Sequence, residues 1–285
     1  FFYNIEAALA TLILSFLQSR FIQVRVNSSL SSPQAILAGV PQGSILSPTL
    51  FNVYIASIFN RCPSNVNLAG FADDLAIFSS SQSLEKAVHR LENASSLIIK
   101  ELNIWKINVN EAKTEAIFFT SSKQSKISVK IKNTEISPKK YIKYLGLWID
   151  SKLLWSHHIN HLNSKAKAIL ARLFWLFKSN SLSIEIKLIL FKVLIRPVIT
   201  YGCPIWHNAA ISHISQLQIT QNKFLRLIGN FPIKTRIPTI HNNLNINSIH
   251  HYILSLTDKF NHSLKNHPNK ELHKINVDLR SKWSR

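Results

Sequence analysis

Apolar and polar positions follow two different periods in the first part of the chain. Residues 7–17 have helical spacing, whereas residues 21–26 alternate with a period of two and predict a strand. Two short apolar runs, 68–72 and 75–78, flank adjacent aspartates and predict a hairpin with the acidic pair at its turn. A long amphipathic pattern over residues 83–105 then predicts a helix.

Shorter patterns continue to residue 150. A helix is predicted at 49–59, a charged hairpin at 126–136, and strands at 115–120 and 141–150. Strands and helices in this order are typical of an α+β class, here with a mixed sheet and helices packed on one of its faces.

Beyond residue 150 the apolar positions recur at helical spacing. Helices are predicted at 155–177, 184–195 and 214–228, and the second of these is expected to end at Arg196-Pro197. The change of period predicts a domain boundary near residue 150.

Charge changes at the same point. The 285 residues carry a formal net charge of +20, which indicates a polyanionic partner. Residues 1–150 contain 15 basic and 10 acidic side chains, whereas residues 151–285 contain 19 and 4. Because the basic residues are spread over many segments and interleaved with aromatic ones, nucleic acid is favoured over an anionic membrane or a solubilising surface.

Several classes of protein are disfavoured by what the sequence lacks. Two cysteines are too few for a disulfide framework or a zinc site, and a reducing compartment is the simplest context. The apolar stretch 7–17 is too short to span a bilayer, so no membrane partner is expected.

The stretch Phe71-Ala72-Asp73-Asp74 is the first candidate for chemistry. Adjacent carboxylates at a hairpin turn point in different directions, so one can face a site while the other supports it. Oxygen ligands suit Mg²⁺, and two such ions can clamp the attacking and leaving oxygens of a phosphoryl transfer. The alternative is an ordinary solvated turn.

Two further motifs are candidates for ligand contacts. Gly39 and Gly43 flank Pro41 and Gln42, and such a loop can approach a nucleotide closely or serve as a plain connection. Ser47 is expected to cap the helix that follows. The run 157–161, His-His-x-x-His, could be read as a metal site, but no cysteine or acid accompanies it.

Taken in order, several stretches resemble the reverse transcriptases of non-LTR retrotransposons, closest to the jockey-like group. The stretches that carry this resemblance are residues 39–48, Phe71-Ala72-Asp73-Asp74, Asn110-x-x-Lys113-Thr114, residues 144–150 with Leu154-Trp155 and His158-Ile159, and Arg196-Pro197 through Tyr201-Gly202 to Trp206.

The resemblance implies a fold. Residues 1–150 would form part of a right-hand polymerase palm, with a mixed or antiparallel sheet and helices. Residues 151–230 would form a helical thumb or connection, and residues 231–285 a basic C-terminal segment that is expected to be loose.

The resemblance also implies an activity, the RNA-directed addition of deoxynucleotides to a primer 3′-hydroxyl with two Mg²⁺ ions, for which Mn²⁺ is a possible substitute. The implied partners are an RNA template, a DNA primer, their RNA–DNA hybrid and deoxynucleoside triphosphates, in a ribonucleoprotein of nucleus and cytoplasm. No oligomeric state is implied.

Roles for individual residues follow from the same resemblance. Asp73 would be the main metal ligand, and Asp74 a weaker ligand or a support for the turn. Pro41, Gln42 and Gly43 would line the nucleotide pocket, and Phe71 would pack beside the primer end. Lys113 would contact the triphosphate or donate a proton to the pyrophosphate. Leu145 and Gly146 would hold the primer backbone.

One departure from the family pattern changes the expectation for this chain. The family carries another metal-binding aspartate on an earlier strand, whereas residues 1–38 contain only one acid, Glu6. The chain has no Met and opens at Phe1, so it is expected to begin within a longer reading frame and to be inactive alone. The alternatives are a non-catalytic remnant that binds RNA or hybrid, and a maturase-like protein.

Overall fold

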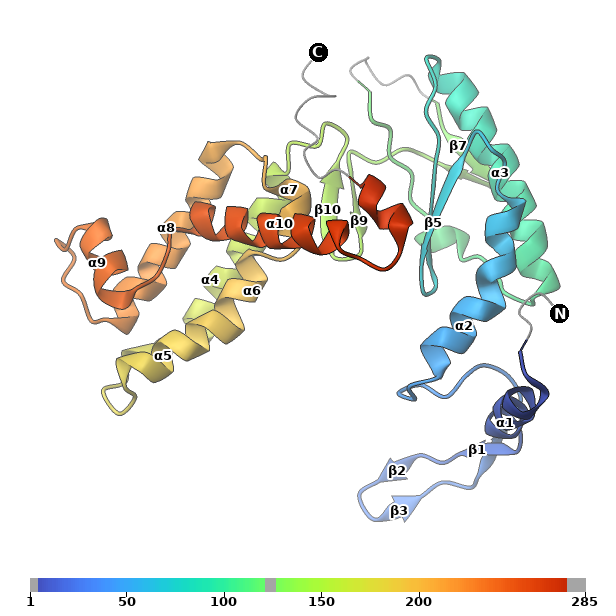
Figure 1. The fold of residues 1–285 in the computed structure, drawn as a ribbon, viewed down its shortest axis with the longest axis horizontal. Helices are drawn as coiled ribbons and strands as arrows, with labels where there is room; N and C mark the ends of the chain where they lie inside the picture. Colours follow the sequence, from blue (N-terminus) through green and yellow to red (C-terminus); the bar gives the residue numbers. More distant parts are fainter. Residues whose placement is uncertain (1–4, 121–126, 276–285) are drawn as a thin grey trace. The chain divides into compact units, whose positions relative to one another are not determined.

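Packing separates the chain into two units in the computed structural model, which describes residues 5–120 and 127–275 (Figure 1). Unit 1 contains the described residues among 1–114 and 126–137, and unit 2 contains those among 115–125 and 138–285. The change of unit near residue 138 precedes the boundary expected near residue 150, because the segment between them packs on the helices that follow it.

Unit 1 combines two long helices with short hairpins. Its helices are α1 (Ala7–Leu17), α2 (Ser47–Ile55), the 3₁₀-helix η1 (Ala56–Arg61), α3 (Leu84–Ile104) and the 3₁₀-helix η2 (Glu111–Lys113). Its strands are β1 (Arg20–Ile22), β2 (Arg25–Val26), β3 (Ser29–Leu30), β4 (Gln34–Ile36), β5 (Asn67–Phe71), β6 (Asp74–Phe78), β7 (Val129–Ile131) and β8 (Thr134–Ile136).

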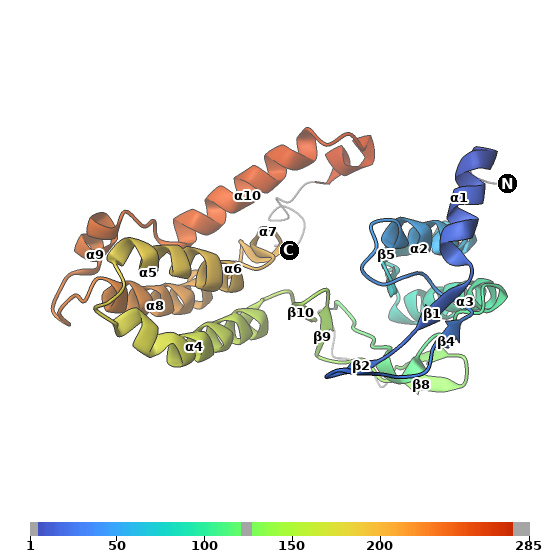
Figure 2. The same cartoon turned by 90° about the horizontal axis from the view of Figure 1, so that it is seen from below.

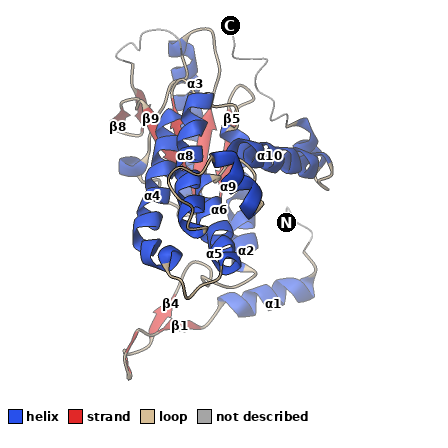
Figure 3. Cartoon of the chain, turned by 90° about the vertical axis from the view of Figure 1, so that its left-hand side faces the viewer, coloured by secondary structure: helices blue, strands red, loops and turns tan. Residues whose placement is uncertain are grey.

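The strands of unit 1 pair only within hairpins. The described strands form the antiparallel pairs β1–β4, β2–β3, β5–β6 and β7–β8, and all of them are short (Figure 3). The antiparallel pairing agrees with the α+β prediction. A single mixed sheet is not formed within the described residues, because each strand pairs with one partner only.

The core of unit 1 holds the β5–β6 hairpin in place. Ile58, Ile98 and Leu102, from η1 and α3, are buried, and Leu75 and Ile77 of β6 pack against them. One face of the hairpin therefore packs on the helices, whereas the residues of its turn are exposed. By contrast, no residue of α1 is buried.

A buried carboxylate joins the helices of this core. Glu101 of α3 is 7% exposed and accepts hydrogen bonds from Arg61 Nε at 2.9 Å and Trp105 Nε1 at 3.2 Å. Hydrogen bonds from Ser57 and Arg61 lower the pKa of Glu101, so the charge is paired where it is buried.

Several predictions for unit 1 are confirmed. The helices expected at 7–17 and 83–105 are α1 and α3, and the acidic hairpin is β5–β6. The prediction that Ser47 caps the next helix is wrong. Ser47 is the first residue of α2, and its hydroxyl donates to the carbonyl oxygen of Pro41 at 2.5 Å.

Unit 2 is one hairpin followed by helices. Its elements are β9 (Tyr141–Tyr144), β10 (Leu147–Asp150), α4 (Ser156–Lys178), α5 (Ile184–Leu190), the π-helical turn η3 (Phe191–Ile195), α6 (Arg196–Ile199), α7 (Cys203–Trp206), α8 (Ile211–Ile228), α9 (Ile237–Leu244), α10 (Ile249–Lys265) and η4 (Lys270–Lys274). Helices α4, α5 and α8 lie side by side (Figure 2).

Two apolar clusters form the core of unit 2. One brings Leu147 of the hairpin against Ile159 and Trp206, so the hairpin packs on α4 and α7. The other places Phe177, at the end of α4, with helices α5 and α8.

Three predictions for this region are wrong. Residues 115–120 form no strand, and Ala116 makes only an isolated bridge to Pro138. The strand expected at 141–150 is a hairpin that turns at Leu145-Gly146. The helix expected to end at Arg196-Pro197 continues through η3 into α6, whose first turn contains the proline. The π-helical turn before it changes the hydrogen-bond spacing, and the Arg196 N–H donates to the Phe191 carbonyl oxygen.

The C-terminal segment is more ordered than expected. Within the described residues it forms α9, α10 and η4, and Ile249 and Ile253 of α10 are fully buried. Residues 276–285 lie outside the described part. No helix in the described part of the chain has the length and apolar character to cross a bilayer.

We predict that Phe224→Ala destabilises unit 2 strongly. Phe224 is fully buried, and its ring centroid lies 5.7 Å from those of both Phe177 and Phe191. The free energy of unfolding measured in urea is expected to fall by about 3–5 kcal/mol. Phe260→Ala is the control, because Phe260 is 41% exposed and its loss is expected to cost less than about 1 kcal/mol. Equal losses in both variants would contradict the assigned core.

Candidate functional site

The acidic turn follows directly from the register of the β5–β6 hairpin. Phe71 pairs with Asp74, which leaves Ala72 and Asp73 as a two-residue turn. Ala72 has a φ of 51°, a left-handed conformation that is uncommon for a residue other than glycine. Asp73 therefore lies at the tip, and Asp74 is the first residue of β6.

Both carboxylates of this turn are available to a ligand. Asp73 and Asp74 are exposed, and no hydrogen bond or ion pair to either carboxylate occurs among the residues that the structure describes. Phe71 beside them is 65% exposed, which is unusual for so large an apolar side chain. The tip thus combines two unpaired negative charges with an open aromatic face.

The hairpin is packed closely at Gly70 and Leu75, the residue pair next to the one that closes its turn. A Cβ atom added at Gly70 would lie 3.0 Å from Cζ of Phe59 and 3.3 Å from Cδ2 of Leu75. Only glycine fits here without displacement, so the strand approaches η1 as closely as its backbone allows. The contact between Gly70 and Phe59 therefore packs β5 against η1 close to the turn.

The donor chemistry of the turn fits a hard divalent cation. Mg²⁺ is usually bound by one or two protein carboxylates and completes its shell with water and substrate phosphates. Asp73 and Asp74 supply that number of carboxylates. Across residues 5–120 and 127–275, no group of three or more His, Cys, Asp or Glu side chains is placed to hold a metal by itself.

The loop around Pro41 is anchored at its ends and open in its middle. Arg20 donates to the carbonyl oxygen of Gly39 at 2.7 Å, and Ser47 holds the carbonyl of Pro41. Gln42 and Gly43 are exposed. Both loop glycines have positive φ, 81° at Gly39 and 88° at Gly43, and a Cβ atom added at either would meet nothing within 4 Å. The loop therefore offers accessible backbone.

Lys113 lies at the end of η2, where the local sequence explains the turn. The side chain of Asn110 accepts a hydrogen bond from the Lys113 amide at 3.2 Å. The Lys113 side chain is exposed. Within the described residues, no hydrogen bond or ion pair joins Lys113 or the Pro41 loop to the acidic turn, although all three belong to unit 1.

Leu145 and Gly146 belong to unit 2, where they form the turn of the β9–β10 hairpin. Both have positive φ, 46° for Leu145 and 81° for Gly146. The sequence predicted a continuous strand here and missed this turn. The pair Leu-Gly before an apolar run was the only local signal for it.

His158 is a buried imidazole between the hairpin and α4. It is fully buried, and its Nδ1 atom accepts a hydrogen bond from the Trp148 amide at 3.3 Å. Burial lowers the pKa of His158 to about 4; the backbone at Tyr201 opposes this effect, and His161 and Lys165 add to it. His158 is therefore neutral at pH 7. Its Nδ1 atom is occupied by the Trp148 amide, and no group of three or more His, Cys, Asp or Glu side chains in the described residues could hold a metal, which argues against the metal interpretation of 157–161.

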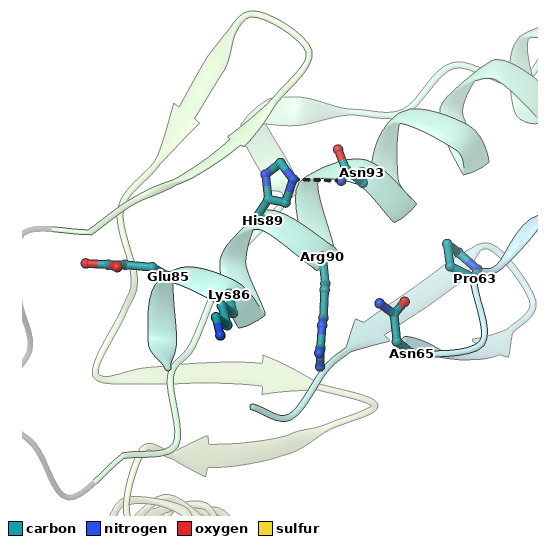
Figure 4. A pocket seen from close by; sticks show the side chains of 7 residues that line it. All are labelled: Pro63, Asn65, Glu85, Lys86, His89, Arg90 and Asn93. Carbon is teal, nitrogen blue, oxygen red and sulfur yellow. Dashed lines mark hydrogen bonds between the residues drawn. The ribbon is translucent and has the colours of Figure 1, made fainter. Parts of the chain in front are cut away.

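A groove in unit 1 was not predicted. It has a volume of about 580 Å³ and is lined by Pro63, Asn65, Glu85, Lys86, His89, Arg90 and Asn93 (Figure 4). His89 and Asn93 are joined by a hydrogen bond of 3.1 Å, and Arg90 donates to the carbonyl of Ser80 at 3.0 Å. None of the site residues expected from the sequence lines this groove.

Comparison with known proteins identifies a family for the first half of the chain. Residues 3–149 match the family model described as reverse transcriptase (RNA-dependent DNA polymerase). No solved structure matches the chain.

Two similar proteins match this chain over most of its length. The "Probable RNA-directed DNA polymerase from transposon X-element" of Drosophila melanogaster is 30% identical over 267 residues, which cover 91% of this chain and 29% of that protein. The "RNA-directed DNA polymerase from mobile element jockey" of the same species is 30% identical over 284 residues, covering 95% and 31%. The chain thus spans less than a third of the length of these relatives.

We predict that His158 makes unit 2 sensitive to acid. Because the pKa of His158 falls from 6.5 to about 4 on folding, the unfolded chain binds more protons between these values. The contribution of His158 to the free energy of unfolding is fully present above pH 6.5 and is lost as the pH falls toward 4. Between pH 7 and pH 4.5 the free energy of unfolding is expected to fall by about 2 kcal/mol through this residue.

Urea unfolding of His158→Gln at the two pH values measures this contribution. The variant is expected to lose less stability on acidification than the wild type does. His250→Gln is the control, because His250 is exposed and its variant is expected to keep the wild-type pH dependence. The same acid sensitivity in all three proteins would exclude His158 as the source.

Proposed function

Since this chain belongs to the reverse transcriptase (RNA-dependent DNA polymerase) family, we propose that it is part of the RNA-directed DNA polymerase of a non-LTR retrotransposon of the jockey-like group. Residues 1–150 would be the later part of its palm. Residues 151–230 would be the thumb or connection, and the helices beyond them a basic extension.

The acidic turn is the observation that carries this proposal. Two adjacent carboxylates without a protein cation, on a rigid hairpin and beside an exposed Phe71, have no evident structural role in unit 1. Unpaired carboxylates at a fixed position suit the binding of divalent cations. In a polymerase, Mg²⁺ held by Asp73 and Asp74 would offset the charge that develops on phosphate oxygens during phosphoryl transfer.

The other residues would bind and orient the reactants. Gln42 and the open backbone of its loop would contact the incoming deoxynucleoside triphosphate, and the Lys113 ammonium its phosphates. Phe71 would pack beside the primer end. Leu145 and Gly146 would hold the primer backbone.

The basic face of α4 supports a polyanionic partner. Lys165, Lys167, Arg172 and Lys178 are exposed on this helix. Trp175 is 75% exposed, and the Lys178 Nζ atom lies 5.6 Å from the centre of its ring. Such a face would bind an RNA–DNA hybrid through its phosphates and shape, with little dependence on sequence.

We predict that Asp73→Asn abolishes primer extension and preserves nucleic-acid binding. Extension of a DNA primer on an RNA template with Mg²⁺ should be assayed in the longest reading frame that contains these residues. Loss of a metal ligand is expected to reduce the rate by at least about 10²-fold, because the charge of the transition state is no longer offset. RNA affinity is expected to change little, since Asp73 has no protein partner to lose.

Glu85→Gln is the matched control, because it removes one exposed carboxylate from the same unit. It is expected to extend primers at the wild-type rate. If Asp73→Asn also abolished RNA binding, the residue would be structural. If no protein extended a primer while all bound RNA, the alternative of a non-catalytic RNA- or hybrid-binding remnant would replace the polymerase.

We also predict that the basic face of α4 sets the salt dependence of hybrid binding. Replacing its four cations with glutamine is expected to weaken binding and reduce the slope of log K against log salt by about 0.7–0.9 for each phosphate that is no longer neutralised. The measurement is a titration of hybrid binding at several salt concentrations. The four substitutions are Lys165→Gln, Lys167→Gln, Arg172→Gln and Lys178→Gln.

A charge-matched variant separates this face from net charge. Four exposed lysines elsewhere in unit 2 supply it, namely Lys223, Lys234, Lys259 and Lys265. Their replacement is expected to leave most of the slope intact. Equal slopes in the two variants would mean that α4 does not contact the hybrid.

A further inference from the structure

The turn of the β9–β10 hairpin adopts a backbone that its sequence does not favour. Leu145 and Gly146 both lie in the left-handed region, at φ values of 46° and 81°. Glycine adopts this conformation freely, whereas a leucine rarely does. Contacts from elsewhere in unit 2 must therefore hold Leu145 in place.

Tyr201 makes that contact from 56 residues further along the chain. Its hydroxyl donates a hydrogen bond of 2.8 Å to the carbonyl oxygen of Leu145. Its ring lies against the next residue, because a Cβ atom added at Gly146 would be 3.0 Å from Cε1 of Tyr201 and 3.1 Å from its hydroxyl oxygen. One side chain thus binds the carbonyl of the turn and covers its glycine.

Tyr201 is itself held by the core of unit 2. The indole Nε1 atom of Trp206, which is fully buried, donates to the Tyr201 carbonyl oxygen at 2.8 Å. Gly202 comes next and has a φ of 65°, and a Cβ atom there would lie 2.6 Å from Cδ2 of Leu147. The segment between α6 and α7 therefore fits against the hairpin and allows Tyr201 little freedom.

The hydroxyl of Tyr201 is not needed to complete the core. Tyr201 is 50% exposed, so a phenylalanine would keep the ring contact with Gly146. The hydroxyl instead fixes the direction of the Leu145 carbonyl group. The structure contains no cis peptide bond among the residues it describes, and in a trans peptide the amide hydrogen points opposite to the carbonyl oxygen. With the Leu145 carbonyl bound to Tyr201, the Gly146 N–H points away from Tyr201.

We propose that Tyr201 is a positioning residue that orients the Leu145–Gly146 peptide so that the Gly146 N–H binds a phosphate of the primer strand. This inference rests on the proposed function, in which the turn holds the primer backbone. Backbone amides are frequent donors to nucleic-acid phosphates. A hydrogen bond to a phosphate from an amide already held in its direction loses little entropy on binding.

The test compares wild type with Tyr201→Phe in binding to an RNA–DNA hybrid that has a recessed primer 3′ end. Single methylphosphonate substitutions remove the charge of one primer phosphate at a time. In the wild type, substitution at one position near the primer end is expected to weaken binding by about tenfold, which corresponds to the loss of one charge-assisted hydrogen bond. In Tyr201→Phe that penalty is expected to fall below about twofold, because the amide is no longer held in direction.

Two controls make the result specific. Tyr252→Phe removes a tyrosine hydroxyl from the same unit and is expected to keep the full penalty. The ring centre of Tyr252 lies 4.2 Å from Cζ of Arg196. Gly146→Ala, whose Cβ atom would press on Tyr201, is expected to lose the penalty as Tyr201→Phe does. Thermal unfolding of each variant shows whether unit 2 remains folded.

The outcomes separate the two levels of the proposal. A wild-type penalty that persists in Tyr201→Phe would overturn the positioning role and leave the polymerase assignment standing. A wild type that binds the hybrid no better than other polyanions, with no sensitive phosphate, would overturn the proposed function and this inference with it. The inference is supported if the penalty is lost in Tyr201→Phe and Gly146→Ala and is kept in full in Tyr252→Phe.

Discussion

The apolar contact between the β5–β6 hairpin and helix α3 is the constraint on which the acidic turn depends. Leu75 and Ile77 pack on Ile98 and Leu102, and Gly70 lets the strand approach η1 to within one side-chain layer. Burial of this apolar face of the hairpin determines the register of the two strands, and the register determines which residues form the turn. A shift by one residue would remove Asp73 from the tip and direct the apolar positions to solvent.

In unit 2 the β9–β10 hairpin is held by apolar packing of Leu147 and by a carboxylate at its end. The carboxylate of Asp150 accepts backbone hydrogen bonds from Lys152, Leu154 and Trp155, at 3.1, 3.0 and 2.8 Å. These bonds order the connection from β10 into α4 and satisfy amides at the helix start. The turn of the β5–β6 hairpin is exposed, whereas that of the β9–β10 hairpin is half-buried beside Tyr201.

The balance of basic and acidic side chains differs between the two units. In the described part of unit 1 two cations, Arg61 and Lys132, are paired with carboxylates. In unit 2 the basic side chains outnumber the acids, and Lys178 of α4 lies over the exposed rings of Phe174 and Trp175. In the proposed function, unit 2 would bind the polyanion and unit 1 would hold the divalent cations. Both requirements belong to template-directed polymerisation.

The sequence alone determined the elements whose signals are local. Helices α1 and α3 follow from apolar spacing, and the acidic hairpin follows from two apolar runs around Asp73-Asp74, because periodicity and turn chemistry act over a few residues. The tertiary structure decided the turn at Leu145, the passage of the helix through Pro197, and the contact of Tyr201 with a carbonyl 56 residues away. These features depend on packing between segments distant in the chain, which local spacing does not encode.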